Sequence, residues 1–385
     1  PVFFYGQAYL GSLDAILVAA SFALAGPSIL AIRLVQTGLY LGTILTSMLL
    51  VREMRFSNGT ATVVGLLLAF PPVLFTLYTT VSLGGYGEAL LLGNLILLVT
   101  LRLMRGKPST RALAGWGALA GVSLWAFGLT LVYSVPAGGM LLRATMAKET
   151  NRARASKLGA LALGLVTGAF PMVIWGWSHG PAALVGELLG SAIAGASPES
   201  FPSAILAHAV NLVLFGPTVV LGARPPWGIL ALGMPFTPVA AALSLAALGA
   251  GLRRSSWPRG DTPGRALLAW VAVLLVAGFL LTGFGADPSG RYFLPLVVIL
   301  AIFMGAGTTA LALKARPALI YALLGLILGF HIWNHLQVGL RPPFFTTQFD
   351  AETRYDHRFD PALVEFLLDQ GETRGYATYW TAYPL

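Results

Sequence analysis

The sequence predicts an all-α multi-pass membrane protein with about ten transmembrane helices, followed by the start of a small C-terminal α/β domain. Three observations favour this fold class. Of 385 residues, 56% are hydrophobic and only 10% are charged, whereas soluble domains average about 25% charged residues. Several apolar runs reach the roughly 20 residues that a helix needs to cross a bilayer. Basic residues gather in short loops between those runs, which is typical of membrane proteins.

Ten apolar runs have ends that suit a crossing helix. Taken in chain order, they cover residues 27–51, 60–79, 86–104, 112–126, 128–143, 157–178, 236–252, 266–283, 292–313 and 317–337.

The basic residues fix the direction of these helices. Seventeen of the 24 Lys and Arg residues lie in the short loops 52–59, 102–111, 143–157, 253–265 and 314–316. If every one of these loops is cytoplasmic, the ten runs alternate without contradiction. The net charge of +9 therefore reflects topology, and we do not expect a nucleic-acid partner.

Two further apolar stretches do not fit as crossings. Residues 9–25 contain Asp14, and we interpret them as a helix that lies at the outer interface. Counting residues 204–222 as a crossing would place the loop 253–265 outside, against the basic-residue rule. We therefore interpret 179–235 as an outer excursion with interfacial or re-entrant helices. Its single basic residue is Arg224.

The composition changes after residue 337. Residues 1–340 form the polytopic membrane domain, and the acid-rich residues 341–385 form the start of a soluble domain on the outer face. Asp360-Pro361 is a good N-cap and first-turn pair, and Gly371 a good stop, so we expect a short helix over 361–370. The aromatic run from Gly375 to Tyr383 predicts a strand.

Several classes of chemistry find no support in the sequence. Cysteine is absent, so there is no disulfide framework and no thiol nucleophile. No phosphate-cradling glycine loop, zinc-protease motif or nucleophile elbow is present. The chain starts at Pro1 and stops at Leu385 straight after the strand-like run, and we interpret it as a fragment cut at both ends.

Asp14 and Glu88 are the only acidic residues inside apolar segments. Charges at membrane depth are costly, about 2.5–3.5 kcal/mol at a helix centre, and they usually line a functional cavity. One interpretation of Glu88 is a cavity-facing carboxylate, favoured by the preceding glycines, which let the backbone approach a ligand. The other is a carboxylate that complements the helix dipole. The same two alternatives hold for Asp14.

Arg291 lies beside Tyr292 at the outer end of a helix, directly after the turn formed by residues 287–290. It is either an interfacial arginine that snorkels to the lipid surface or a cation that grips a phosphate, which the fork of a guanidinium suits. His179 is a weak candidate metal ligand, because no neighbouring group has a diagnostic ligand spacing. His331 and His335 share one helix face, where we expect interface anchoring.

Three segments resemble bacterial membrane glycosyltransferases of the GT-C superfamily, nearest to the family 39-like enzymes, which include protein mannosyltransferases and the lipid A aminoarabinose transferase. The segments are Phe3 to Leu13 followed by Phe22 to Leu34, then Gly290-Arg291-Tyr292-Phe293-Leu294-Pro295-Leu296, and the tail Gly375 to Tyr383. The second segment matches the Arg-Tyr-x-x-Pro pattern on a late helix of that family.

The resemblance implies transfer of a sugar from a polyprenyl-phosphate donor to a glycan, lipid or protein acceptor at the outer face of the bacterial plasma (inner) membrane. A general-base aspartate would activate the acceptor hydroxyl, and its position falls before Pro1, so the catalytic residue of this fragment is unknown. Eight residues are expected to line the cavity for substrates: Tyr5, Gln7, Tyr9, Asp14, Tyr86, Glu88, Arg291 and Tyr292. A divalent metal stays open as a cofactor, although Gln7-Ala8 stand where some relatives have Glu-Lys.

Two rival functions stay open. A transporter or flippase for a lipid-linked sugar or a small molecule also needs a polar cavity among helices. The absence of a visible inverted repeat and the long outer excursion 179–235 argue against it. A non-catalytic assembly subunit is the third alternative.

Overall fold

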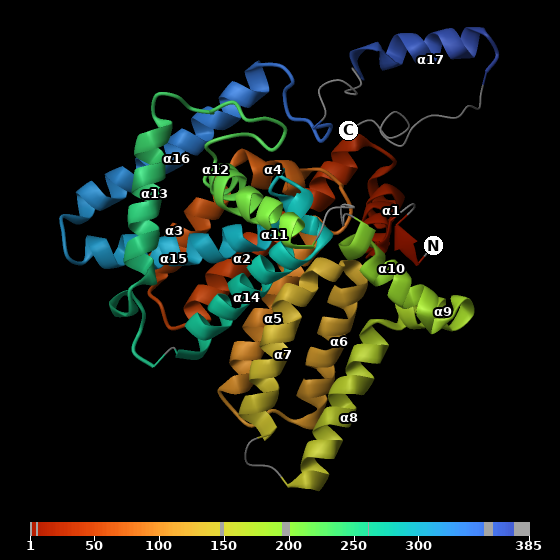
Figure 1. Cartoon of the computed structure of the whole chain (residues 1–385), viewed down its shortest axis with the longest axis vertical. Helices are drawn as coiled ribbons and strands as arrows, with labels where there is room; N and C mark the ends of the chain where they lie inside the picture. Colours follow the sequence, from red (N-terminus) through yellow and green to blue (C-terminus); the bar gives the residue numbers. More distant parts are fainter. Residues whose placement is uncertain are drawn as a thin grey trace.

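The computed structural model describes residues 2–4, 7–146, 150–194, 201–260, 262–349 and 357–372. Helices dominate these residues, and their two short strands, β1 (Phe3–Phe4) and β2 (Gln7–Gly11), form one antiparallel pair. The predicted all-α membrane fold is confirmed in this coarse form (Figure 1).

The helices of the first half are α1 (Leu13–Ala25), α2 (Ile29–Glu53), α3 (Asn58–Ala69), α4 (Val73–Thr80), α5 (Tyr86–Met104), α6 (Thr110–Ala126), α7 (Leu131–Met146) and α8 (Asn151–Gly168). Those of the second half are α9 (Phe170–His179), α10 (Pro181–Ala194), α11 (Phe201–Val210), α12 (Gly216–Val220), α13 (Thr237–Leu252), α14 (Thr262–Leu281), α15 (Leu294–Ala312), α16 (Pro317–Leu340) and α17 (Asp360–Asp369).

Hydroxyl side chains begin four of the membrane helices. The Oγ atoms of Ser28, Ser57 and Ser109 accept hydrogen bonds from backbone amides in the first turns of α2, α3 and α6, over 3.1, 3.1 and 3.2 Å. Thr150 does the same for α8 over 3.4 Å. Each cap satisfies an amide that has no partner within the helix and so fixes where the helix begins.

Among the described residues, six helices are long and apolar enough to cross a membrane, or up to eight if each of two bent pairs is one span. The bent pairs are α3–α4 and α8–α9, which break by 78° and 75°. Pro71 and Pro72 lie in the first break and Pro171 just after the second, where a missing amide interrupts the helix. The expected runs 60–79 and 157–178 are therefore broken helices rather than straight ones.

Other segments also differ from the expected pattern of ten runs. The helices α6, α7 and α13 have 17, 16 and 16 residues, so they fall short of the usual spanning length. The stretch Phe201–Val220, which we expected to be interfacial or re-entrant, forms 20 residues of helix that do meet the length and composition of a span.

Small residues allow α6 and α8 to pack backbone against backbone. Gly117 and Gly121 on α6 face the carbonyls of Leu161 and Leu165, where an added Cβ would overlap them. Gly164 and Gly168 on α8 likewise face the carbonyls of two alanines of α6. Both helices thus carry the small-xxx-small pattern that brings membrane helices together. Gly251 and Gly307 make the same kind of contact between α13 and α15.

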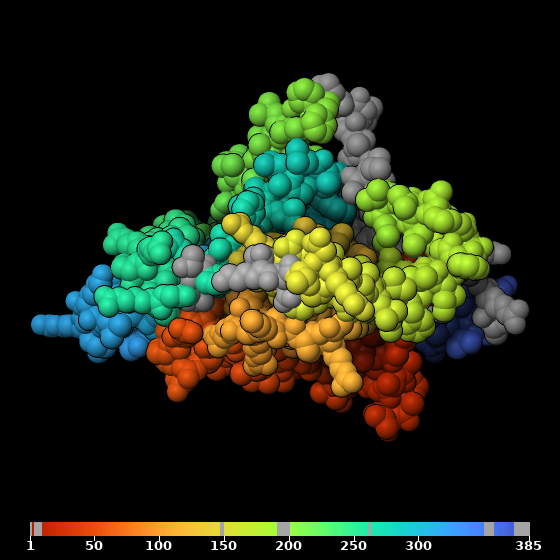
Figure 2. Space-filling model, turned by 90° about the horizontal axis from the view of Figure 1, so that it is seen from below, coloured from red at the N-terminus to blue at the C-terminus, as the bar shows by residue number. Residues whose placement is uncertain are grey.

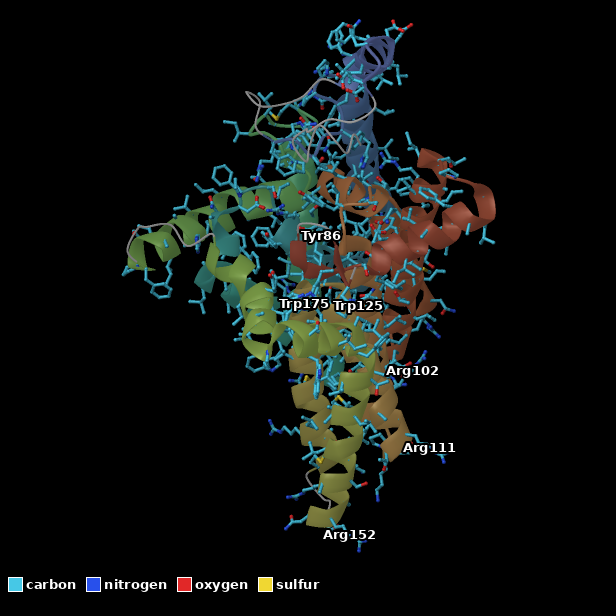
Figure 3. All side chains as sticks on the ribbon, turned by 90° about the vertical axis from the view of Figure 1, so that its right-hand side faces the viewer. Tyr86, Arg102, Arg111, Trp125, Arg152 and Trp175 are labelled. Atoms are coloured by element: carbon cyan, nitrogen blue, oxygen red, sulfur yellow. The ribbon has the colours of Figure 1, made fainter. Side chains whose placement is uncertain are left out.

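The basic loops gather at one end of the bundle. Glu53 forms ion pairs with Arg102 and Arg105 over 3.1 and 2.7 Å, which joins the loops after α2 and α5. Figure 3 places Arg102, Arg111 and Arg152 at this same end, well away from Tyr86. Seen from this end, α13 and α16 lie on one side of the central helices, and α8 and α9 lie on the other (Figure 2).

The polar segments meet at the opposite end. A β-bridge joins Leu10 to Phe127, and the indole Nε1 of Trp125 donates to the Val2 carbonyl over 2.9 Å. Arg33 at the start of α2 donates to the Thr80 carbonyl over 2.6 Å. The chain therefore brings the N-terminal strands, the loop after α4 and the loop after α6 to one place, where the candidate site lies.

The C-terminal region is described only in part. The predicted helix over 361–370 is confirmed as α17, which lies apart from the bundle in Figure 1. It begins at Asp360 after Phe359 and has no side-chain cap, so the expected Asp360 cap is wrong. The expected strand 375–383 lies outside the described residues.

Candidate functional site

Asp14 is buried between three segments. It lies in the first turn of α1, and only 2% of the residue is exposed. The Gln36 amide Nε2 on α2 donates to its Oδ1 over 2.6 Å, and the Ser82 hydroxyl donates to its Oδ2. The expected interfacial helix thus carries its acidic residue inward, where two neutral donors replace water around the carboxylate.

Glu88 lies beside Asp14 on α5. It is also 2% exposed, and the two carboxyl groups are close enough to interact. Apart from Asp14 and the backbone amide of Glu88 itself, no group in the described part of the chain donates to the Glu88 oxygens. A buried carboxylate with few donors is costly, because its desolvation is poorly compensated. The dipole of α5 offsets only about 0.3–1 kcal/mol of that cost.

The first turn of α5 is built to bring Glu88 to this place. Gly84 and Gly85 have φ angles of 71° and 80°, a conformation that favours glycine. A Cβ on Gly85 would lie 2.9 Å from a Leu10 methyl group, and one on Gly87 would lie 3.1 Å from Gln36 Oε1. These glycines therefore allow close approach, as expected, but to protein neighbours in the described structure.

Arg291 forms an ion pair with Asp287, with 2.5 Å between Nε and Oδ2. Its guanidinium carbon lies 5.0 Å from the centre of the Tyr292 ring. The arginine side chain is 39% exposed and the aspartate side chain 18%. The terminal nitrogens of Arg291 make no hydrogen bond to the described residues. Asp287 therefore holds the guanidinium through Nε, and the two terminal nitrogens can bind another group.

Three tyrosines surround this cation. Tyr78, Tyr86 and Tyr292 all interact electrostatically with Arg291. The rings of Tyr78 and Tyr86 lie 5.0 Å apart between centroids. Because Tyr86 begins α5 two residues before Glu88, the same helix end contributes to the carboxylate pair and to the surroundings of Arg291.

Arg224 fixes the turn that carries Arg291. It is 6% exposed, and every one of its five N–H groups has an acceptor. Nε donates to Thr218 Oγ1 over 3.1 Å, and the four terminal hydrogens go to carbonyls of Pro225, Gly228, Phe215 and Pro288, over 3.1, 3.3, 3.1 and 2.5 Å. Burial lowers the pKa of Arg224, and the Asp287 carboxylate opposes that change.

The turn is also defined by its own residues. Asp287 Oδ1 accepts the Ser289 amide over 2.8 Å, which closes an Asx turn. Gly290 has a φ of 88°, and a Cβ there would overlap Val219. Arg224, which the sequence analysis used only as evidence for topology, therefore connects this turn to the excursion 179–235 through hydrogen bonds.

Some predicted site residues cannot be placed in the site. Tyr5 lies outside the described residues. The backbone of Gln7 and Tyr9 forms β2, and their side chains are not described. The structure thus brings together Asp14, Glu88, Tyr86, Arg291 and Tyr292 from the predicted set, without testing their roles.

His179 has no further ligands beside it, among the described residues, with which to form a metal site. Its ring stacks on Trp175 with 4.3 Å between centroids, and Nδ1 contacts the Ser178 hydroxyl and the Trp175 carbonyl over 2.8 and 3.0 Å. Within the described ranges, no group of three His, Cys, Asp or Glu residues could hold a metal ion. The Asp14–Glu88 pair supplies two carboxylates only, and donors already occupy those of Asp14.

The two histidines of α16 are not interface anchors. His331 is buried at 6% exposure. His335 contacts the Thr76 hydroxyl through Nε2 over 2.7 Å and the His331 carbonyl through Nδ1 over 2.7 Å. Asn334, between them, donates to the Gly222 carbonyl over 2.8 Å. This face of α16 therefore binds α4 and the outer excursion instead of facing lipid.

Comparison with protein-family models, with curated proteins and with solved structures finds no match. The resemblance to membrane glycosyltransferases therefore stays a hypothesis, and the function must be argued from the geometry.

Sequence reasoning missed three members of the site. Gln36 and Ser82 are ordinary polar residues in their segments, and nothing in their spacing shows that they meet Asp14. Arg224 was recognised as a lone cation in an apolar excursion, and that isolation was the available signal. A single basic residue in 57 positions, with no neighbouring acid, needs buried acceptors if it is to leave water.

Proposed function

We propose that the chain transfers a sugar from a polyprenyl-phosphate donor to an acceptor hydroxyl at the outer face of a bacterial plasma membrane. The observation that carries this proposal is the buried Asp14–Glu88 pair, in which Glu88 interacts with Asp14 and its own backbone amide but with no other donor among the described residues. Membrane proteins retain costly buried carboxylates at functional sites. A substrate hydroxyl is the neutral donor that would satisfy Glu88.

In this proposal the two charged groups have separate tasks. Glu88 accepts the hydrogen bond of the acceptor hydroxyl and orients its oxygen, with Asp14 held behind it by Gln36 and Ser82. The acceptor oxygen bonds to the anomeric carbon while the bond from that carbon to the phosphate oxygen breaks. The hydroxyl proton passes to Glu88, which in this proposal takes the base role that the resemblance assigns to an aspartate before Pro1, and the phosphate leaves with the electron pair.

Arg291 is suited to binding the phosphate that leaves the sugar. A donor phosphate gains negative charge as the sugar departs, and a fixed cation stabilises that charge. The exposed edge of the guanidinium offers two parallel N–H groups, which match two phosphate oxygens. Asp287 and the Arg224-bound turn keep this edge in place. Tyr292, which is half-buried beside it, is suited to packing against a sugar face. The proposal includes no metal ion, because the described residues contain no group of three possible metal ligands.

The proposed topology places the site and the C-terminal domain on the same side of the membrane. The ten apolar runs cross the membrane, the basic loops face the cytoplasm, and the site opens outward. Residues 341–385 begin a small α/β domain on the same outer side, where an acceptor would bind. The gathering of the basic loops at the end opposite the carboxylate pair supports this arrangement.

A transporter or flippase is the second candidate, and the same observation favours it. A carboxylate pair without a counter-charge is also what a proton-coupled carrier places among its helices. The two candidates differ in the fate of the donor. An enzyme separates the sugar from its phosphate, whereas a carrier moves the intact molecule.

The test uses Glu88→Gln in the full chain, reconstituted with a defined polyprenyl-phosphate sugar. We expect turnover to fall by about tenfold or more, because the amide cannot accept a hydroxyl proton. Glu187→Gln, at an exposed position of α10, is the matched control and should keep full turnover. Gel filtration confirms that both variants fold. Equal transfer by Glu88→Gln and the wild type would refute the site, and intact donor on the far leaflet would favour transport.

A further inference from the structure

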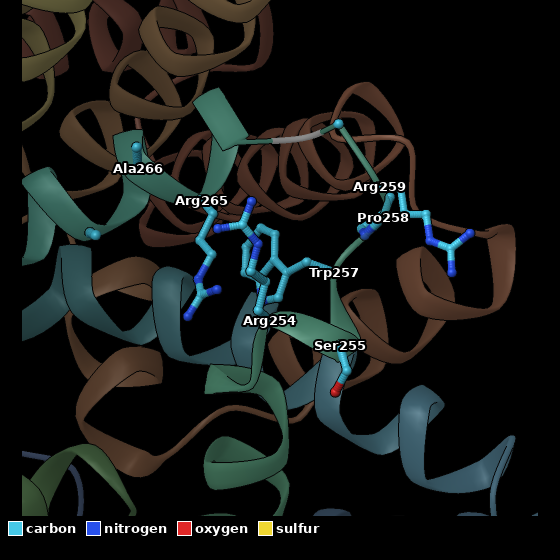
Figure 4. Close-up of a pocket in the computed structure, with 9 residues that line it drawn as sticks. Arg254, Ser255, Trp257, Pro258, Arg259, Arg265 and Ala266 are labelled. Atoms are coloured by element: carbon cyan, nitrogen blue, oxygen red, sulfur yellow. The ribbon is translucent and has the colours of Figure 1, made fainter.

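A second candidate site lies at the basic end, in the connection between α13 and α14. A cavity of about 660 Å³ opens there. Three arginines line it, Arg254, Arg259 and Arg265, together with Ser255, Trp257 and Pro258 (Figure 4). This cavity is separate from the carboxylate pair and independent of the proposed function.

A buried tryptophan anchors the cavity. Trp257 is 8% exposed, and its Nε1 donates to the Gly251 carbonyl over 2.7 Å. Its ring packs edge-on against Phe56 at 5.1 Å and against Phe303 at 5.1 Å between centroids. The wall is therefore rigid and continuous with α13 and α15, rather than a solvated loop.

Two of the arginines gather around this ring. Arg265 has its guanidinium carbon 6.0 Å from the Trp257 ring centre, and its Nη2 donates to the Leu252 carbonyl over 2.6 Å. Figure 4 shows Arg254 beside Trp257, on the same side as Arg265, while Arg259 points away from both. Backbone and ring contacts hold Arg265, whereas no described residue contacts the Arg254 guanidinium through a recorded hydrogen bond.

These positive charges have no counter-charge among the described residues. No ion pair is recorded there for any of the three arginines, in contrast to Arg102 and Arg105, which share Glu53. Arg55 adds a further cation, since its Nη1 lies 3.9 Å from the place of a Cβ on Gly260. The only acid in the loop sequence 253–265 is Asp261, which the structure does not describe.

We propose that this pocket binds a phosphate group. Arginine forks fit phosphate oxygens in pairs, and an aromatic wall beside them reduces competition from water. The pocket lies where a lipid headgroup would stand if the basic loops face the cytoplasm, and anionic lipids attract such clusters. The same chemistry is offered by a soluble phosphate compound.

The experiment is native mass spectrometry of the full chain in detergent, titrated with short-chain phosphatidylglycerol, short-chain phosphatidylcholine or inorganic phosphate. The first variant is Arg254→Ala, because that side chain makes no hydrogen bond or ion pair with the described residues. The second is Arg265→Lys, which keeps the charge and removes the fork. Arg316→Ala, at another basic loop, is the control for charge alone.

We expect phosphatidylglycerol to bind more tightly than phosphatidylcholine, and Arg254→Ala to weaken it about tenfold, the effect of losing one charge-assisted contact. Arg265→Lys should weaken it in the same direction, and Arg316→Ala should leave it unchanged. Binding of inorganic phosphate with the same dependence on Arg254, without preference for phosphatidylglycerol, supports a soluble ligand of the same pocket. Equal binding by Arg254→Ala and Arg316→Ala, or no binding of either anion, overturns the proposal.

Discussion

Arg224 gives the most specific structural prediction, because every N–H group of its side chain has an acceptor. Its five N–H groups serve one hydroxyl and four carbonyls, from Phe215 to Pro288. Arg224→Ala removes all five donors. Arg224→Lys keeps the charge, but its three hydrogens radiate from one nitrogen and cannot reach acceptors spread around a planar fork.

The expected loss in the free energy of unfolding depends on the acceptors that lose their donor in each variant. Hydrogen bonds to charged groups contribute about 1.5–3 kcal/mol each, and the five are not additive because one side chain makes them all. Removing one member of a buried charged network costs about 3–5 kcal/mol. We expect that loss for Arg224→Ala, reduced by any water that reaches the freed carbonyls. Arg224→Lys should lose about half as much, since it satisfies at most three of the five acceptors.

The assay is unfolding of the purified full chain in detergent, followed by tryptophan fluorescence. Arg259→Ala is the control, because that side chain is exposed and has no hydrogen-bond or ion-pair partner among the described residues, and such a change usually stays within about 0.5 kcal/mol. The order of stability should be wild type and Arg259→Ala, then Arg224→Lys, then Arg224→Ala. If Arg224→Ala unfolds together with the control, the five bonds do not hold the turn and the reasoning is refuted.

Three further predictions concern packing, topology and the donor. Gly164→Ala should destabilise the bundle by about 1–3 kcal/mol in the same assay, since its methyl group overlaps an α6 carbonyl; Gly159→Ala on the same helix meets open space and should not. Cysteines introduced at Ser197 and Ser255 into this cysteine-free chain should label from opposite faces of the membrane, and labelling from one face contradicts the topology. Arg291→Lys should weaken donor affinity by about tenfold, because lysine cannot form the fork; unchanged affinity, measured by donor titration, would leave Arg291 with only its Asp287 pair.

Much of the helical fold could be predicted from hydrophobic runs and basic loops, because bilayer length and loop charge are local properties of the sequence. The helices α2, α5, α14, α15 and α16 agree with expected runs to within a few residues. The bends at residues 69–73 and 168–170 were not predicted, although prolines mark both. The segment Phe201–Val220 forms a helix with the length and composition of a span, whereas the basic-residue rule led us to leave it out of the ten runs.

The candidate site was predictable only where a residue type is exceptional for its surroundings. Asp14 and Glu88 stood out as acids in apolar runs, but that they form a pair depends on how α1 packs against α2 and α5. The same holds for the tie between Arg224 and Pro288, which are 64 residues apart. Contacts of this kind depend on the tertiary arrangement, and no periodicity in the sequence encodes them.

The central claim is that the sugar leaves its phosphate within this protein, and the products test it most directly. The full chain is reconstituted with a labelled polyprenyl-phosphate sugar and a range of glycan, lipid and peptide acceptors. The account predicts free polyprenyl phosphate in amounts equal to the sugar covalently attached to one acceptor class. Donor that stays intact in the presence of every acceptor, whether or not it changes leaflet, would contradict it.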